Sequence, residues 1–341
     1  MSKGKDNSRI PDVIERLFAG RAAITSGEVA DAAGVSRQAA HYHLKRLEDR
    51  GILLHLGAGR GGRYLRRADR ATTFALAGLQ EDLIWSAEFR ALDDLSPDIF
   101  ENPRVRPILT WAFTEMLNNA IDHSGGEEVE ARWYLTAGQI AFEIEDDGIG
   151  ALRRMRESRA LGSDFEAIGE IAKGKQTSAP ERHSGLGIYF TSRMVGRFFL
   201  SSGNLTWTVD NRRGDQAVGW LERERQGTLV RCEVDLSTSV RPIEVFDEFS
   251  APDLHGFNKS TVRVSLFGEG DFVSRSEAKR IGAHLEDFNL VELDFSGIEQ
   301  VGQGFIDELF RVWQLAHPET RLVPINANPA IMSMIASMSP T

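Results

Sequence analysis

The sequence has a single cysteine, no long hydrophobic run, and no net positive charge beyond its first seventy residues. Its single cysteine, Cys232, excludes an intrachain disulfide framework, and its place in an alternating apolar stretch favours a small buried residue over a reactive thiol. No apolar run approaches the roughly 20 residues needed to cross a bilayer, and the polar start, Met1 to Ser8, differs from a signal peptide. With 41% hydrophobic and 26% charged residues, the chain is expected to be a globular cytoplasmic protein without membrane contact.

Positive charge is concentrated at one end of the chain. Residues 1–70 contain 14 Lys and Arg against 8 Asp and Glu, a net charge of +6, whereas residues 71–341 contain 26 against 42, a net charge of −16. An acidic protein with one basic end is expected to meet polyanions through that end only. The length of 341 residues leaves room for two or three domains, each with its own core.

The basic end has the pattern of three helices and a hairpin. Apolar residues recur at helical spacing over 10–18 and 26–33, and Gly34 marks a helix end. Ser36 is suited to be the N-cap of a third helix over 37–50, in which the inward residues follow one another at spacings of four and three. The inward residues of this third helix are Ala40, Leu44 and Leu47.

Two short expected strands, 52–56 and 64–67, follow this helix and are joined by a basic, glycine-rich loop. The whole order resembles the winged-helix DNA-binding family. The resemblance implies that the outward side chains of the third helix face the major groove and that two arginines of the wing lie near phosphates or in the minor groove. These side chains are Arg37, Gln38, His41, Tyr42 and Lys45 on the helix, and Arg60 and Arg63 on the wing. The alternative is a winged helix that only docks proteins, and the basic charge counts against it.

A second pattern begins with the helix expected at Trp111–His123, which has apolar residues at spacings of four, three and four. Glu115 and Asn119 lie one turn apart, so their side chains share a face of this helix. A carboxylate beside a carboxamide can position a water and help to hold a hard cation. The plainer interpretation is a solvated helix face.

Glycine-rich turns follow this helix in three places. Glycine permits positive φ and close approach to a ligand, and a glycine turn at a helix N-terminus presents free N–H groups to phosphate. A hairpin is expected over 129–144, and a closing strand over 227–234. The turn residues are Asp146, Gly148 and Gly150 after the hairpin, Gly185 and Gly187 before a helix, and Gly227 and Thr228 in the closing strand.

The order of these segments resembles the GHKL ATP-binding family of gyrase-type ATPases, histidine kinases and anti-sigma kinases, over residues 80–236. The resemblance implies that Asp146 binds the adenine amino group and that Asn119 binds the Mg²⁺ that bridges the phosphates. Glu115 would orient or deprotonate the attacking group, and Thr228 would support the adenine pocket. The glycines that would line the nucleotide are Gly148, Gly150, Gly185 and Gly187. The alternative is a plain α+β domain with turn glycines.

By the same resemblance, residues 151–184 would form a lid over ATP. This segment contains Lys173, Lys175, Arg182 and His183 among Gly, Ser and Thr. Contact between these charges and phosphate is one interpretation, and an ordinary solvated loop is the other.

The last eighty residues alternate strands and helices, which implies a small parallel or mixed sheet with helices on it. The expected strands are 262–267, 291–295 and 321–325, and the expected helices are 278–288, 305–316 and 330–338. The segments Asp294–Ile298 and Gly304–Leu309 resemble the STAS family, or a divergent STAS-like domain that accompanies GHKL domains. In antagonist members of that family a serine before the second helix accepts phosphate, but Gly304 stands there. An interaction or lid-sensing role is therefore expected in place of a phosphorylation switch.

We predict a multidomain protein, α+β overall. Its parts are a winged helix-turn-helix over 1–70, a helical linker over 71–107 with a helix at 74–92, a central GHKL α/β sandwich over 108–236, a linker over 237–259, and a small STAS-like α/β domain over 260–341.

The predicted function is that of a Mg²⁺-dependent, ATP-binding and ATP-hydrolysing DNA-binding regulator, whose nucleotide state controls binding to DNA or to a protein partner. GHKL ATPases often close on ATP as homodimers, which would reset the spacing of two recognition helices. The alternative is an anti-sigma-type serine/threonine kinase, against which Gly304 and the added DNA module count. A sensor histidine kinase is disfavoured because the sequence shows no separate phosphoacceptor helix pair, and a component of a defence or toxin system stays open.

Overall fold

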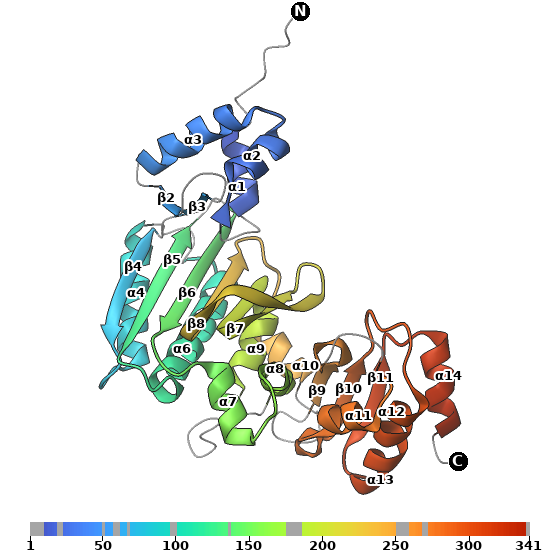
Figure 1. The fold of residues 1–341 in the computed structure, drawn as a ribbon. Coiled ribbons are helices and arrows are strands. Elements are labelled where there is room, and N and C mark those ends of the chain that lie inside the picture. The colour runs from blue at the N-terminus through green and yellow to red at the C-terminus, as the bar shows by residue number, and fades with distance from the viewer. Residues whose placement is uncertain are drawn as a thin grey trace, which may run out of the picture. The chain divides into compact units, whose positions relative to one another are not determined.

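The computed structural model forms two compact units, Met1–Arg70 and Ala71–Thr341, which are described in turn (Figure 1). None of the described helices is both long and apolar enough to cross a membrane. The residues that the structure describes are 10–18, 23–49, 52–56, 62–66, 69–95, 101–135, 138–174, 186–249, 259–267 and 272–338.

The N-terminal unit has the predicted order of three helices and a hairpin. Its strands form an antiparallel sheet in the order β1-β3-β2. Its elements are α1 (Ile10–Phe18), β1 (Ala23–Ile24), α2 (Ser26–Ala33), α3 (Arg37–Asp49), β2 (Leu53–Leu56) and β3 (Arg63–Arg66).

Local signals explain where these helices begin and end. Helix α2 begins at a capping box in which Glu28 N donates to Thr25 Oγ1 and Thr25 N donates to Glu28 Oε2. It ends at Gly34, whose φ of +68° is left-handed, as expected of a C-terminal glycine. Ala40 and Leu44 of α3 are fully buried in the core of this unit, which confirms their predicted inward direction.

The second unit is built on a five-stranded sheet in the order β4-β5-β6-β8-β7. Neighbours from β5 to β7 are antiparallel, and the hairpin predicted over 129–144 is confirmed as β5 and β6. The strands are β4 (Arg70–Ala75), β5 (Glu128–Leu135), β6 (Gln139–Asp146), β7 (Arg197–Asp210) and β8 (Asp215–Asp235). Cys232 of β8 lies opposite Phe142 of β6 and Phe198 of β7 and is fully buried, as predicted.

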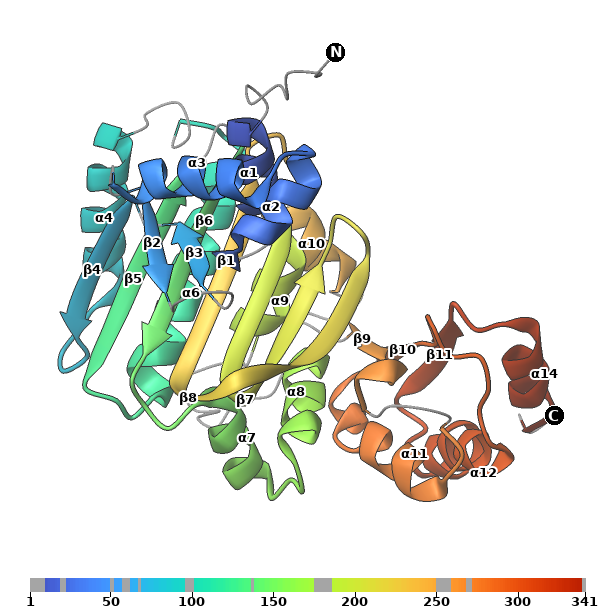
Figure 2. The same cartoon turned by 45° about the horizontal axis from the view of Figure 1, so that its top comes forward.

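Helices α4 (Glu81–Leu95), α6 (Val105–His123) and α9 (Gly187–Met194) lie on one face of this sheet (Figures 1 and 2). The predicted apolar stripe of α6 is buried. Its Phe113 stacks on Trp133 of β5 with the ring centroids 5.1 Å apart. This packing fixes the rotation of α6 on the sheet. Helices α7 (Ala151–Arg159) and α8 (Asp164–Lys173) follow β6 in the chain.

Two segments predicted as linkers contain packed helices or strands in their described residues. Residues 71–107 are not a helical linker, because β4 is an edge strand of the sheet and α4 packs on α6. The helix expected from 74 begins only at Glu81, since the β-branched and aromatic run before it favours a strand. Residues 237–259 contain α10 (Pro242–Glu248), whose Phe246 ring meets Phe190 of α9 edge-on at 4.7 Å.

The last part of this unit has a parallel three-stranded sheet in the order β11-β10-β9. A capping box of Ser274 and Glu277 opens α11. The elements are β9 (Lys259–Arg263), η3 (Val264–Phe267), α11 (Arg275–Gly282), η4 (Leu285–Asp287), β10 (Leu290–Asp294), α12 (Gln303–Asp307), the π-helix η5 (Glu308–Trp313), α13 (Gln314–Ala316), β11 (Arg321–Ile325) and α14 (Pro329–Met338).

Two predicted elements here differ from the structure by more than one or two residues at an end or in type. The strand expected over 262–267 is β9 followed by the 3-10 turn η3. The helix expected over 278–288 ends at Gly282, and His284 follows with a left-handed φ of +59°. Gly282 packs under Trp313, because a Cβ there would lie 2.8 Å from Trp313 Cδ1. One continuous hydrophobic core joins this C-terminal part to the five-stranded sheet, and α8 packs on β9 and η3.

Candidate functional site

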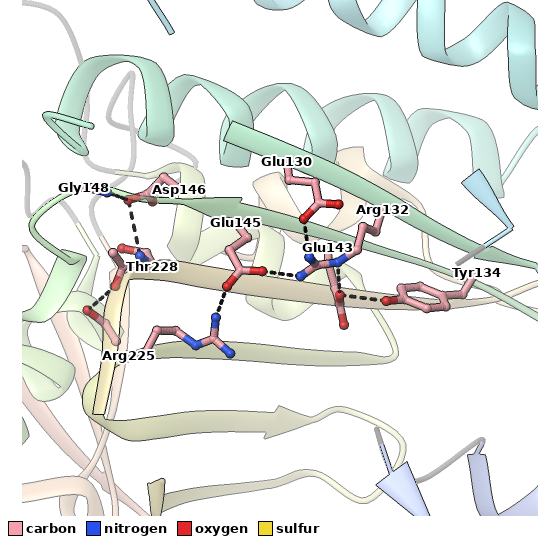
Figure 3. A network of polar contacts seen from close by, with 11 residues as sticks. Glu130, Arg132, Tyr134, Glu143, Glu145, Asp146, Gly148, Arg225 and Thr228 are labelled. Atoms are coloured by element: carbon pink, nitrogen blue, oxygen red, sulfur yellow. Dashed lines mark hydrogen bonds and ion pairs between the residues drawn. The ribbon is translucent and has the colours of Figure 1, made fainter. Parts of the chain in front are cut away.

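Asp146 lies at the end of β6, directly opposite Thr228 of β8 in the sheet register. Its Oδ1 accepts hydrogen bonds from the backbone N–H of Gly148 at 2.9 Å and of Thr228 at 3.3 Å (Figure 3). Only 6% of Asp146 is exposed, and this burial raises the pKa of its carboxyl to about 6 although both hydrogen bonds act to lower it. A buried carboxylate at a strand end can accept a hydrogen bond from an exocyclic amine.

The turn after Asp146 is built for close backbone approach. Thr228 Oγ1 accepts from Ala151 N at 2.8 Å, which ties the start of α7 to β8. Gly150 has a φ of +89°, and a Cβ there would lie 2.5 Å from Ser202 Oγ. Any larger residue at this position would be both strained and too close to its neighbour.

Ser124 and Asp147 also shape this turn, although the sequence pattern does not single them out. The carbonyl of Ser124 accepts from Ile149 N at 2.9 Å, and a Cβ on Gly148 would lie 2.2 Å from the same oxygen. Asp147 Oδ1 accepts from two backbone N–H groups at the start of β5, at 2.8 and 3.1 Å. An aspartate beside a glycine is a known turn signal, whereas nothing local marks Ser124.

Glu115 and Asn119 lie one turn apart on α6, as predicted, and both are half-buried. Helix α9 begins at Gly187, and a Cβ there would lie 2.3 Å from Glu115 Oε2. The N-terminus of α9 therefore directly adjoins the predicted catalytic glutamate. Asn119 Nδ2 is buried and has no hydrogen-bond partner among the described residues, so a ligand oxygen would satisfy it. Gly185 lies outside the described residues.

The side chains near Asn119 fit Mg²⁺ only if a phosphate ligand supplies further oxygens. Within the described parts of the chain, no cluster of three or more His, Cys, Asp or Glu could hold a metal ion. Mg²⁺ usually keeps several waters and takes one or two protein oxygens plus substrate phosphates. The side-chain oxygen of Asn119 suits that mode.

Lys173 differs from its predicted place in a phosphate-touching loop. It is 0% exposed at the end of α8, where Nζ donates to Glu170 Oε1 at 2.5 Å and to the Ala283 carbonyl at 2.6 Å. Burial lowers the pKa of Lys173. The Lys173 ammonium is therefore bound inside the protein by Glu170 and the Ala283 carbonyl. Lys175, Arg182 and His183 lie outside the described residues.

A ladder of ion pairs crosses β5, β6 and β8 beside Asp146 (Figure 3). Arg132 Nε and Arg231 Nη1 contact the two oxygens of Glu143 at 2.8 and 3.1 Å, and Glu145 pairs with Arg132 and Arg225. Burial acts to raise the pKa of Glu143, but the two arginines lower it overall. Cross-strand pairs of this kind stabilise a sheet. We therefore regard the ladder as structural.

Helix α3 exposes all five side chains that were predicted to meet DNA. Ser36 Oγ accepts from Ala39 N at 3.2 Å, which confirms the predicted N-cap. Tyr42 is 60% exposed, and the guanidinium of Arg46 lies 5.9 Å from its ring centroid. The exposed side chains are Arg37, Gln38, His41, Tyr42 and Lys45.

Two of these five side chains already have protein partners. His41 Nδ1 lies 2.9 Å from the hydroxyl of Tyr64 on β3, so helix α3 is tied to the hairpin. Lys45 Nζ pairs with Glu48 and Asp49 of its own helix at 3.0 and 3.2 Å. Arg63 is exposed on β3, and Arg60 lies outside the described residues.

Three family models match parts of the chain. A helix-turn-helix domain matches residues 12–55, a histidine kinase-like ATPase domain matches residues 63–209, and a STAS-like domain of unknown function matches residues 277–332. These matches confirm the predicted architecture and the multidomain α+β fold class. They support a DNA-binding regulator with an ATPase-type domain.

No curated protein matches the chain. A solved structure described as an ICLR transcriptional regulator from Silicibacter sp. TM1040 is 14% identical and covers 70% of this chain and 88% of its own. Its TM-score of 0.19 is too low to support any conclusion about fold or function.

Proposed function

We propose that the protein is a DNA-binding regulator whose central domain binds ATP with Mg²⁺, and that its nucleotide state controls its affinity for DNA or for a protein partner. The observation that carries this proposal is the buried Asp146–Thr228 pair beside the glycine turn. An aspartate whose pKa is raised by burial, held by backbone N–H groups at a strand end, is suited to select a ligand amine.

Each residue of the site has a distinct role in this proposal. Asp146 accepts from the adenine amino group, and Thr228 holds the turn in place. Asn119 contributes to Mg²⁺ and phosphate binding, and the N-terminus of α9, at Gly187, faces the phosphates. The Mg²⁺ ion supplies charge neutralisation at the phosphates. Glu115 orients the attacking water.

The DNA contacts are assigned to the N-terminal unit. The exposed face of α3 provides side chains for base edges in the major groove, and Arg63, with Arg60, provides charge for the backbone. Pairing of two copies on ATP would set the distance between two such helices and so select half-site spacing.

Isothermal titration calorimetry with Mg²⁺ and a non-hydrolysable ATP analogue tests the nucleotide site. We expect a binding heat from the full chain and a thermal shift on addition of the analogue. Absence of both would overturn the proposal.

Incubation with ATP labelled in its γ-phosphate then distinguishes the classes of activity. Free phosphate indicates an ATPase, as we expect. Label on a protein partner would indicate the kinase alternative, and neither product would indicate a nucleotide sensor. Pull-down of genomic DNA with and without ATP, followed by sequencing, identifies the DNA target.

A further inference from the structure

Side chains of α9 cap the open edge of the C-terminal sheet. Among the described strands, β9 pairs with β10 alone, so its other edge has backbone groups that need partners. Thr261 N donates to the hydroxyl of Tyr189 at 3.3 Å, and Arg193 Nη2 donates to the carbonyl of Thr261 at 3.4 Å. Both side chains come from the helix that begins at Gly187 against Glu115.

Packing holds this cap firmly in place. Tyr189 is fully buried, and the guanidinium of Arg193 lies 3.4 Å from its ring centroid. The ring of Phe249 meets Tyr189 edge-on at 5.3 Å. A buried hydroxyl needs a hydrogen-bond partner, so the contact with Thr261 is part of what fixes α9.

The preceding residue of the same strand holds a second helix. Ser260 is fully buried, and its Oγ donates to the carbonyl of Lys173 at the end of α8, at 2.5 Å. The Lys173 ammonium donates in turn to the Ala283 carbonyl, and His284 Nδ1 lies 2.9 Å from Glu170 Oε2. Helix α8 therefore contacts the STAS-like domain through the Lys173 carbonyl and through the side chains of Lys173 and Glu170.

We propose that strand β9 of the STAS-like domain is a positioning element of the nucleotide site, which couples the state of this domain to nucleotide occupancy. Ser260 and Thr261 are consecutive residues of one strand, so they cannot move independently. A displacement of β9 therefore moves the end of α8 and the body of α9 together, and with α9 the N–H groups at Gly187. The inference rests on the proposed function, in which those N–H groups face phosphate.

Thermodynamic reciprocity makes the coupling measurable from both sides. If the contacts of β9 favour the arrangement that binds nucleotide, then bound nucleotide must favour the contacts of β9 by the same factor. A merely structural contact would stabilise the fold without responding to nucleotide.

The first measurement is the affinity of full-length Tyr189→Phe for the Mg²⁺-bound ATP analogue. This substitution removes the hydroxyl that accepts from the Thr261 N–H and keeps the packed ring, and we expect affinity at least about fivefold weaker than that of the wild type. Tyr134→Phe is the matched control, because its hydroxyl donates to Glu143 at 2.9 Å in a contact that involves neither α9 nor β9. The control should bind normally.

The second measurement is amide hydrogen exchange of peptides that cover 259–263, with and without the analogue. Slower exchange on binding is expected in the wild type and in Tyr134→Phe, and a smaller effect in Tyr189→Phe. Ser260→Ala removes the hydroxyl that donates to the Lys173 carbonyl at the end of α8. It should weaken affinity as well and provides the test if Tyr189→Phe fails to fold.

The outcomes separate the two proposals. A wild type that binds the analogue but shows no change in β9 exchange overturns the coupling and leaves the nucleotide site standing. Variants that fold and bind with wild-type affinity overturn it too. A wild type that binds no analogue overturns the proposed function itself.

Discussion

At the scale of single residues, Asp146 determines how the nucleotide site should respond to pH. Its folded pKa of about 6 lies above the ordinary 3.8, so its contribution to stability is present below about pH 4 and is lost as pH rises through 6. The charged form is therefore disfavoured in the folded protein by about 3 kcal/mol. In the role proposed for Asp146, the charged form accepts the hydrogen bond from adenine.

The affinity for the ATP analogue should consequently fall in acid. Protonation with a pKa of about 6 makes binding about tenfold weaker at pH 5 than at pH 7. Calorimetry across this range checks the prediction. Asp147→Asn should keep this loss in acid with its midpoint only slightly lower in pH, because the charge of Asp147 is the smallest of the contributions that act on the pKa of Asp146. A flat wild-type profile would contradict the adenine role of Asp146.

Glu115→Ala should separate binding from turnover. The side chain lies beside the N-terminus of α9, where it can orient a water but is not required to hold the adenine. We expect the affinity for the analogue to stay within a fewfold of the wild type and phosphate release to fall about 10²-fold or more. A variant that hydrolyses ATP normally would show that another group orients the nucleophile.

The glycine turns could be predicted from the sequence as places of close approach. In the structure, a Cβ at Gly148, Gly150 or Gly187 would indeed meet a neighbouring atom. It does not reveal the fate of Lys173. That residue looks like any loop lysine, and one of its two partners, Ala283, is 110 residues away.

At the scale of elements, α3 is the part whose role is easiest to test. Its buried and exposed residues lie on opposite faces of the helix, so one exposed side chain can be removed without disturbing the core. Arg37→Ala should weaken retention of the target DNA by about 1–3 kcal/mol and leave nucleotide affinity unchanged.

Fluorescence anisotropy with labelled target DNA measures this effect at fixed salt. Arg16→Ala is the matched control, because Arg16 is an exposed arginine on α1 and not on the recognition helix. Equal loss in both variants would indicate a general charge effect, and no loss in Arg37→Ala would contradict the assignment of α3.

Elements with a clear internal period were predictable from the sequence, and those fixed by distant partners were not. Helices α1 and α2 and strand β11 have the predicted bounds. Strand β4 was missed because its identity depends on pairing at the edge of the sheet. Helix α11 ends at Gly282, earlier than predicted, and Gly282 lies against Trp313 from a later segment of the chain.

At the scale of the whole molecule, nucleotide and DNA binding should influence each other. The ATP analogue with Mg²⁺ is expected to change the affinity for target DNA at least about fivefold, and DNA should change nucleotide affinity by the same factor. Asp146→Asn should abolish nucleotide binding and with it the effect of nucleotide on DNA binding. Its DNA affinity without nucleotide should equal that of the wild type.

Anisotropy titrations with and without the analogue measure this coupling. Identical DNA affinities under the two conditions would show that the nucleotide controls another partner. The three-part order of the chain could be predicted from its motifs, but the contacts that join α8 and α9 to β9 could not, since they link segments more than sixty residues apart.

The burial of Cys232 gives the molecule an internal reporter. Its thiol lies in the middle of the five-stranded sheet, between two phenylalanines, and burial raises its pKa well above the ordinary value. A thiol-reactive dye can therefore label the chain only when β8 separates from its neighbours. The rate of labelling under native conditions therefore reports how often β8 separates from its neighbours, and no engineered probe is needed.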